Sequence, residues 1–548
     1  MIQVKEIDGL LLREMVLAGA ALLEKNREKV DALNVFPVPD GDTGTNMSLT
    51  MSSATKELNQ KEYLRADQAA EALAKGALRG ARGNSGVITS QLFRGFSKAL
   101  DGLETIRPLD FAKALKAGSD TAYKAVMKPK EGTILTVARV IAEDALRQAQ
   151  AAPDDYDALF NVILTSGEAI LQRTPEMLPV LKQAGVVDAG GRGLLLIYTG
   201  YAAALRGENM DELTCIGESG GADVFEDDHD AIEELKNAYC VKFLVRQAHE
   251  KVRSGDLDTF RRQLNRIGDW VQLDECEEGY RVHVHTNDPG KALQYGLMIG
   301  ELDEMKLDNM VAERRKKEAQ NAETAEKQPP KPHGMVSVSL GEGFSRILHD
   351  LQVDQVVEGG QTMNPSIEDI QKAIDAVNAE TVFVFPNNGN IILAAQQAAQ
   401  LCDKNVLVVP TKNVAMGIAA IVAFQPDMSA EENAARMDEA AQRVRTATVT
   451  YAVRDSEFEG LHIREGDIIG LNNGMVVKQS NDIREVAVSL LKDIVTEDDG
   501  LITVYYGRDI AEESAKALAG ELEDIFPDCD VEVHFGGQPL YYYLISVE

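Results

Sequence analysis

The stretch that decides most about this chain is Leu33-Asn-Val-Phe-Pro-Val-Pro-Asp-Gly-Asp-Thr-Gly-Thr-Asn-Met47. Pro37 and Pro39 exclude a helix there, because proline lacks the amide proton and fixes its own φ angle. We therefore expect a loop that holds Asp40 and Asp42 close together, on either side of one glycine.

Two carboxylates held this close repel each other unless a cation lies between them. At the junction of a loop and a helix, oxygen ligands of this kind predict Mg²⁺ that carries nucleotide phosphates. The helix is expected to begin near Thr45 or Asn46, where its first amides would face the same phosphates. The alternative is that Asp-Gly-Asp only caps this helix, since such turns are common.

Further glycine-rich junctions favour the phosphate-binding interpretation. Gly80-Ala-Arg-Gly-Asn-Ser-Gly-Val87 follows one predicted helix and opens another, and its glycines would let backbone amides approach an anion closely. Lys128-Pro-Lys-Glu-Gly-Thr-Ile134 and Val187-Asp-Ala-Gly-Gly-Arg-Gly193 place more glycine at helix ends. Several such junctions in one helical region predict a nucleotide pocket at one end of a bundle.

Changes in sequence pattern divide the 548 residues into domains. In the first part of the chain, apolar residues recur at spacings of three and four residues, which predicts a helical domain over 1–208. Short strands such as Cys240-Val-Lys-Phe-Leu-Val245 predict an α+β middle domain over 220–311. The charged, proline-ended segment 312–334 is predicted to be a mobile linker. Apolar strands alternate with amphipathic helices over 335–548, which predicts an α/β domain.

Composition restricts the partners and the compartment. A formal net charge of -32 disfavours binding to nucleic acid or to an anionic membrane surface, so a phosphorylated ligand would need metal ions or locally favourable groups. The 5 cysteines are too few and too scattered for a disulfide framework. No apolar run is long enough to cross a bilayer, and the charged start does not resemble a signal peptide. We expect a soluble, cytoplasmic protein without a transmembrane segment.

The motifs of the first 200 residues resemble the nucleotide-binding subunit of the dihydroxyacetone kinase superfamily. The long form of the aspartate motif, together with the middle and the end of the chain, resembles the catalytic subunit of bacterial fatty acid kinase over the whole length. The resemblance implies an all-α helical barrel that binds ATP through two Mg²⁺ ions, and a homodimer. It also implies that the C-terminal α/β domain is related to a two-lobed fatty acid carrier.

By the same resemblance, Asp40 and Asp42 would hold Mg²⁺. Asn34 stands where the family has a third aspartate, which removes one negative ligand. Positions that contact the nucleotide in the family are matched here by Thr45, Asn46, Asn84 and Ser85 at the phosphates, and by Gly132, Thr133, Asp188 and Gly190 around the nucleotide.

The activity implied by the resemblance is transfer of the γ-phosphate of ATP to a fatty acid carboxylate held by a separate fatty-acid-binding carrier protein. The product would be an acyl-phosphate for phospholipid synthesis. A carboxylate with a reference pKa of about 4 is ionised at neutral pH, so we assign no catalytic base. Two other functions stay open: a triose kinase subunit of the dihydroxyacetone type, and a non-catalytic regulator that senses nucleotide or lipid, for which Asn34 leaves room.

A second group of metal-binding side chains is predicted in the middle domain. His283 and His285 alternate in a strand and therefore point to one face. With the thiol of Cys240 from another strand they would form a three-ligand site that suits Zn²⁺. From spacing alone, two ordinary surface histidines and a buried cysteine are an equal alternative; the resemblance favours the metal site.

Small polar residues end several strands of the C-terminal domain, as in Gly360-Gln-Thr-Met-Asn-Pro-Ser366 and Pro386-Asn-Asn-Gly-Asn-Ile391. Tyr451-Ala-Val-Arg-Asp455 adds an aromatic ring and an arginine. Most of these residues are expected to be ordinary loops of an α/β domain. Because no aspartate pair recurs there, we expect this domain to dock the carrier, and the helical domain to bind ATP·Mg²⁺ without it.

Overall fold

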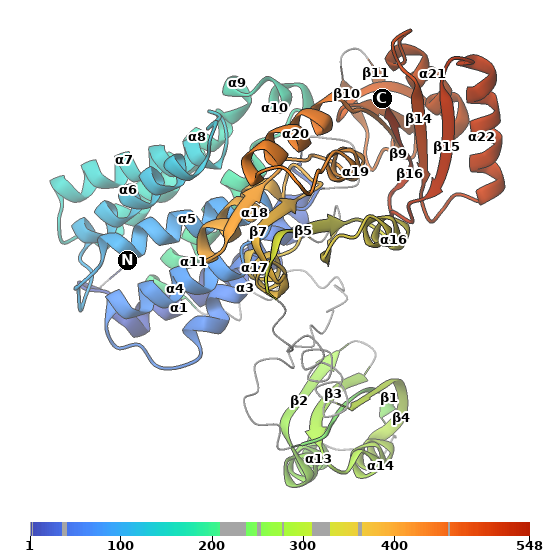
Figure 1. The fold of residues 1–548 in the computed structure, drawn as a ribbon. Coiled ribbons are helices and arrows are strands. Elements are labelled where there is room, and N and C mark those ends of the chain that lie inside the picture. The colour runs from blue at the N-terminus through green and yellow to red at the C-terminus, as the bar shows by residue number, and fades with distance from the viewer. Residues whose placement is uncertain are drawn as a thin grey trace. The chain divides into compact units, whose positions relative to one another are not determined.

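A computed structural model describes residues 2, 4–34, 41–208, 237–248, 254–276, 279–309, 329–359, 364–458 and 461–548. The chain forms two compact units. The first combines Met1–Glu218 with Pro330–Glu548, and the second is Ser219–Pro329 (Figure 1).

The N-terminal part of the first unit is helical, as predicted. Its described elements are α1 Gly9–Lys25, α2 Arg27–Asp31, α3 Thr43–Leu58, α4 Ala66–Arg79, α5 Gly83–Ala99, α6 Pro108–Ala125, α7 Ile134–Ala151, α8 Tyr156–Gln172, α9 Thr174–Met177, α10 Pro179–Ala184 and α11 Ala189–Arg206. One hydrophobic core joins the long helices, with Phe111, Tyr156 and Phe160 fully buried in it. The apolar face of each helix is what stabilises the bundle.

Close approach of α1 and α11 depends on glycine. A Cβ atom at Gly200 would lie 2.5 Å from the Cα of Gly19. No larger residue fits between these two helices without moving one of them. The first and the last long helix of the domain are thereby packed side by side.

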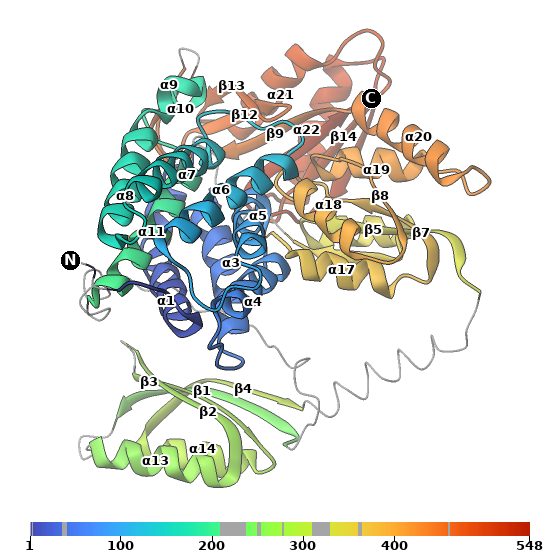
Figure 2. The same ribbon diagram turned by 90° about the vertical axis from the view of Figure 1, so that its left-hand side faces the viewer.

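The second unit is an antiparallel sheet of order β2-β3-β1-β4 with two helices packed on one face (Figure 2). Its elements are β1 Tyr239–Ala248, α13 Ser254–Ile267, β2 Gly268–Cys276, β3 Gly279–Thr286, α14 Pro289–Ile299 and β4 Gly300–Asn309. Phe243, Phe260 and Val284 fill the core between sheet and helices. The unit is α+β, as the alternating strands predicted.

The C-terminal part of the first unit contains two larger sheets. A parallel sheet of order β6-β5-β7-β8 is built from β5 Lys331–Ser339, α16 Glu342–Asp350, β6 Gln355–Glu358, α17 Ile367–Ala376, β7 Ala379–Phe385, α18 Ile392–Leu401 and β8 Asn405–Val408. Strand β5 begins inside the segment 312–334 that was predicted as a linker; residues 310–328 lie outside the described part of the chain.

The second sheet has the order β13-β12-β9-β16-β14-β15, and only β14 and β15 pair in parallel. Between the sheets lie α19 Val414–Val422 and α20 Ala430–Arg443 in sequence, and the remaining elements are β9 Arg445–Tyr451, β10 Ser456–Phe458, β11 Leu461–Ile463, β12 Ile468–Asn472, β13 Met475–Ser480, α21 Ile483–Ile494, β14 Leu501–Tyr506, α22 Glu512–Ile525, β15 Asp530–Phe535 and β16 Tyr541–Val547. The predicted α/β class is confirmed for this region, with a mixed second sheet.

The helical domain and the α/β domain share a hydrophobic core. Ala81, just before α5, and Val87, near its start, pack with Ile367 and Ile370 of α17. Figure 2 shows α17 and α18 beside the helical domain. The two domains therefore meet through buried side chains.

Candidate nucleotide and metal sites

A cavity of about 1100 Å³ lies in the first unit, and both of its domains line it. Seven of the residues predicted from the sequence are in its wall: Asn34, Asp42, Asn46, Asn84, Ser85, Asp188 and Gly190. Thr45, Gly132 and Thr133 are described but are not in the wall. Asp40 lies outside the described residues. Most of the predicted nucleotide residues that can be placed therefore share one cavity.

The N-terminus of α3 is capped by Asp31, a residue that the sequence analysis missed. Its carboxylate accepts hydrogen bonds from the amides of Gly44 at 2.6 Å and Thr45 at 3.2 Å, and from the Thr45 hydroxyl at 2.8 Å. The helix begins at Thr43, two or three residues before the expected start at Thr45 or Asn46. Burial raises the pKa of Asp31, and the hydrogen bonds from Thr45 and Gly44 oppose that rise. The predicted phosphate contacts of Thr45 thus compete with Asp31.

The side chain of Asp42 does not cap α3, although its backbone is at the N-cap position. Asp42 is 5% exposed, and its carboxylate accepts a hydrogen bond from Nδ2 of Asn364. Asn46 is 2% exposed, and its Oδ1 lies 3.4 Å from the same Nδ2. The Oδ1 of Asn34 accepts a 2.8 Å hydrogen bond from the Thr43 hydroxyl. Carboxylate and amide oxygens of this kind are the hard ligands that fit Mg²⁺.

The glycines in the first turn of α5 allow close packing between two helices, and the approach of their amides to an anion stays a prediction. Gly83 has a left-handed φ of 58°, and a Cβ atom there would lie 2.5 Å from Nδ2 of Asn46. A Cβ atom at Gly86 would lie 2.3 Å from the Thr50 hydroxyl. These glycines allow α5 to pack closely on α3, which brings Ser85 next to the start of α3, where its hydroxyl lies 3.5 Å from the Thr43 carbonyl.

Asp188 caps α11 at another part of the cavity wall. Its carboxylate accepts a 2.7 Å hydrogen bond from the Gly191 amide, and burial raises its pKa to about 6. Gly132 has a left-handed φ of 83° and donates its amide to the Thr136 hydroxyl. Thr133 is the N-cap of α7, and its hydroxyl donates to the Lys130 carbonyl. The last two residues therefore shape the turn before α7.

The α/β domain supplies wall residues that the sequence analysis assigned to ordinary loops. Asn390 accepts a 3.2 Å hydrogen bond from Asn84, so the domain touches a predicted phosphate position. Lys412 and Arg445 are the cationic residues among those lining the cavity, and Arg445 pairs with Asp499. The motif around residue 360 was noted for its polar strand end, but only the tertiary fold shows that Asn364 reaches Asp42.

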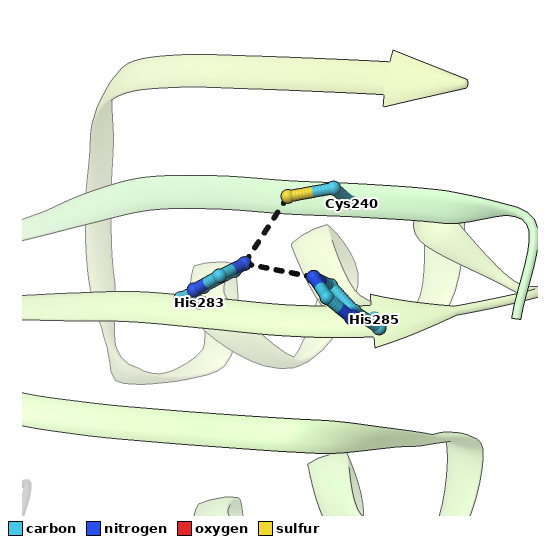
Figure 3. Close-up of side chains that lie close together, drawn as sticks. All are labelled: Cys240, His283 and His285. Carbon is cyan, nitrogen blue, oxygen red and sulfur yellow. Dashed lines mark hydrogen bonds between the residues drawn. The ribbon is translucent and has the colours of Figure 1, made fainter. Parts of the chain in front are cut away.

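The structure brings the three predicted ligands of the middle domain together (Figure 3). The Cys240 Sγ lies 3.1 Å from Nε2 of His283, which lies 3.2 Å from Nε2 of His285. The thiol stands opposite His285 in the pairing of β1 and β3, and both residues are buried. Thiolate and imidazole are the ligands that tetrahedral Zn²⁺ prefers, so this set of donors suits the ion.

In the described residues, none of the helices has the length and apolar character needed to span a membrane.

Family models match three parts of the chain. A DAK2 domain matches residues 37–203, the middle domain of the FakA-like fatty acid kinase proteins matches 236–317, and the C-terminal domain of the same proteins matches 334–548. Among solved structures, a DegV family protein from Corynebacterium glutamicum aligns with 40% of this chain and 98% of its own, at 16% identity and a TM-score of 0.33. The fatty acid kinase B3 protein of Streptococcus pneumoniae, loaded with linoleic acid, aligns with 39% of this chain and 99% of its own, at 11% identity and a TM-score of 0.28.

Relatives of full length are also similar in sequence. Protein YloV of Bacillus subtilis (strain 168) is 44% identical over 554 residues, which is 100% of both chains. An uncharacterized protein of Staphylococcus saprophyticus is 40% identical over 553 residues, again 100% of both. By the matched domains and by these identities, the chain belongs to the FakA-like family of fatty acid kinase proteins.

Proposed function

We propose that this chain transfers the γ-phosphate of ATP to the carboxylate of a fatty acid that a separate fatty-acid-binding protein presents. The product is an acyl-phosphate, which serves phospholipid synthesis. One observation carries the proposal: Asp42, Asn46 and Asn34 gather oxygen donors around the start of α3, in the wall of a cavity of about 1100 Å³.

Asp40, Asp42 and Asn34 would hold Mg²⁺. The bound ion would neutralise negative charge on the phosphates of ATP. Phosphoryl transfer depends mainly on positioning and on charge stabilisation. The residues of the cavity wall do the positioning: Ser85 and Asn84 lie at the start of α5 beside α3. Lys412 adds a positive charge from the α/β side, which favours the negative charge that develops on the transferred group.

The fatty acid acceptor needs no side chain of this protein to act as a general base. A fatty acid carboxylate is ionised at neutral pH and is already a nucleophile, whereas the hydroxyl of a triose needs activation or an anchor. The triose kinase and the non-catalytic regulator remain the competing functions, and the assay below separates all three.

Two assembly features belong to the proposal. We propose that Cys240, His283 and His285 bind Zn²⁺ and thereby stabilise the middle domain, because their donor atoms all lie within 4.8 Å of one another. We also propose that the protein is a homodimer. Sedimentation at micromolar concentration tests this, and a mass near 59.7 kDa would mean a monomer.

The function is tested by following ATP consumption with fatty acid, carrier protein and Mg²⁺, omitting each in turn. The proposal predicts that each omission stops turnover. Turnover with dihydroxyacetone in place of fatty acid and carrier would establish the triose kinase. Nucleotide binding without turnover of either acceptor would establish the regulator.

A further inference from the structure

Residues of the α/β domain hold the chain on both sides of the aspartate loop. After the loop, Nδ2 of Asn364 donates to Oδ2 of Asp42. Before the loop, the Arg454 guanidinium donates to the carbonyl oxygens of Ala32, at 2.6 Å, and of Asn34. The two contacts come from segments of the α/β domain that lie far apart in sequence, and each reaches a predicted Mg²⁺ ligand: the side chain of Asp42 and the backbone carbonyl of Asn34.

The segment that carries Asn364 is itself fixed to the helical domain. Nη1 of Arg82 donates to the Asn364 carbonyl at 2.8 Å, and its guanidinium lies 3.6 Å from the Asp369 carboxylate. The Ile367 amide donates to the Ala81 carbonyl at 3.1 Å. These bonds determine where the Asn364 backbone lies, so its side chain has little freedom to leave Asp42.

The surroundings of the Asn364 side chain point to a role beyond stability. The residue has no exposed surface, and its Oδ1 has no hydrogen-bond partner in the described residues. A buried amide oxygen without a partner costs free energy, so an apolar residue of the same shape would fill this place at least as well. What asparagine adds is a donor directed at the Asp42 carboxylate.

A donor placed in this way orients a metal ligand. A carboxylate that binds a cation through one oxygen is commonly held by a hydrogen bond to the other, and such outer partners affect metal affinity strongly. Nδ2 of Asn364 donates to Oδ2 of Asp42, and this bond fixes the orientation of the carboxylate. Asn46, 3.4 Å from the same Nδ2, is oriented along with it.

We infer that Asn364 is a positioning residue for the metal site, and that the α/β domain thus completes the ATP·Mg²⁺ site of the helical domain. The inference rests on the proposed function and deepens it: the C-terminal region does more than dock the carrier. A helical domain that binds ATP·Mg²⁺ without it, as the sequence suggested, would lack the donor to Asp42.

The test compares Asn364→Ala and Asn364→Leu with Gln397→Ala in the full-length protein. Gln397 accepts a buried 3.0 Å hydrogen bond from Gln91 across the same domain contact, and neither of these glutamines lines the cavity. Gln397→Ala is therefore a matched control, because it also removes one buried hydrogen bond between the two domains. Binding of a non-hydrolysable ATP analogue is measured by titration calorimetry without Mg²⁺ and at a series of Mg²⁺ concentrations, together with the melting temperature.

Both Asn364 variants are expected to need about 10- to 100-fold more Mg²⁺ for half-maximal enhancement of nucleotide binding, by the usual effect of losing an outer metal partner. Mg²⁺-free binding and the melting temperature should match those of Gln397→Ala. An unchanged Mg²⁺ requirement, or equal loss in Gln397→Ala, would overturn the inference. If neither Asn364 variant folds, Arg454→Met, which releases the other flank of the loop, decides by the same readout. Absence of any Mg²⁺-dependent binding in the wild type would instead overturn the proposed function.

Discussion

The carboxylate of Asp31 accepts hydrogen bonds from both the amide and the hydroxyl of Thr45 and so closes the N-terminus of α3. Asp31→Ala leaves these donors and the Gly44 amide without their partner, which should lower the free energy of unfolding by about 1–3 kcal/mol. Urea denaturation followed by circular dichroism measures this.

Asp8 provides the control for Asp31. It is an exposed N-cap of α1 that accepts one 2.8 Å hydrogen bond, from the Leu11 amide. Asp8→Ala should cost only about 1 kcal/mol. Equal losses in the two variants would show that Asp31 is an ordinary cap.

The raised pKa of Asp188 makes stability depend on pH. Because burial disfavours the charged carboxylate, the stabilising contribution of Asp188 is complete below its unfolded value of about 4 and is lost as pH rises through about 6. Asp188→Asn keeps an acceptor for the Gly191 amide and removes the charge. The variant should match the wild type near pH 4 and exceed it by about 1–2 kcal/mol at pH 8, after allowing for screening by water in the cavity.

Urea denaturation at the two pH values checks the Asp188 prediction. Asp155→Asn is the control, because this N-cap of α8 is exposed and accepts a similar bond from the Ala158 amide at 2.9 Å. A stability difference for Asp188→Asn that does not grow between pH 4 and pH 8 would contradict the explanation.

Loss of the middle-domain thiol should remove bound zinc. Thiolate and neutral imidazole are needed for binding, so Cys240→Ser is expected to lower the zinc content from about one per chain to near zero and to lower the melting temperature. Metal analysis after purification measures it. Cys402→Ser is the control, since burial raises the pKa of the Cys402 thiol to about 11 and keeps it protonated. An equal zinc content in the wild type and in both variants would contradict the proposal. Equal high contents would mean that zinc binds at another site, and equal contents near zero would mean that the protein binds none.

Lys412 should matter for turnover more than for nucleotide affinity. Lys412→Met removes a positive charge from the cavity wall, and a loss of roughly 10- to 100-fold in kcat is expected if that charge acts on the transferred group. Lys516→Met is the control, because Lys516 pairs with Glu512 on the exposed surface of α22. Steady-state kinetics with carrier-bound fatty acid separate kcat from KM. An unchanged kcat would remove Lys412 from the mechanism.

The sequence was sufficient for the helical and strand content because apolar periodicity is a local property. Helices from Gly9 to Arg206 and the strands β1 and β3 lie where the pattern placed them. The start of α3 was predicted two or three residues too late because Asp31, rather than a residue of the aspartate loop, caps it. That cap comes from the end of α2, and no local pattern predicts it.

Only part of the candidate site could be predicted from the sequence. Motifs before residue 200 identified Asp42, Asn46 and Asp188, which share the cavity. Asn364 and Arg454 could not be found in this way, because they meet the site only through packing of the α/β domain on the helical domain. Strand alternation predicted that His283 and His285 share a face, whereas their grouping with Cys240 was favoured by the family resemblance.

The central claim is that the chain phosphorylates a fatty acid carboxylate through the Asp42 site. The most direct measurement supplies ATP, Mg²⁺ and carrier-bound fatty acid labelled in its acyl chain. Hydroxylamine then traps the acyl-phosphate by displacing its phosphate, so the label stays in the acyl hydroxamate that is measured. Asp42→Asn keeps the shape and an acceptor for Asn364 but loses the charge that would hold the metal. We predict fatty acyl hydroxamate with the wild type and a loss of at least about 100-fold with Asp42→Asn at an unchanged melting temperature. Equal product from both proteins, or none from the wild type, would contradict the account.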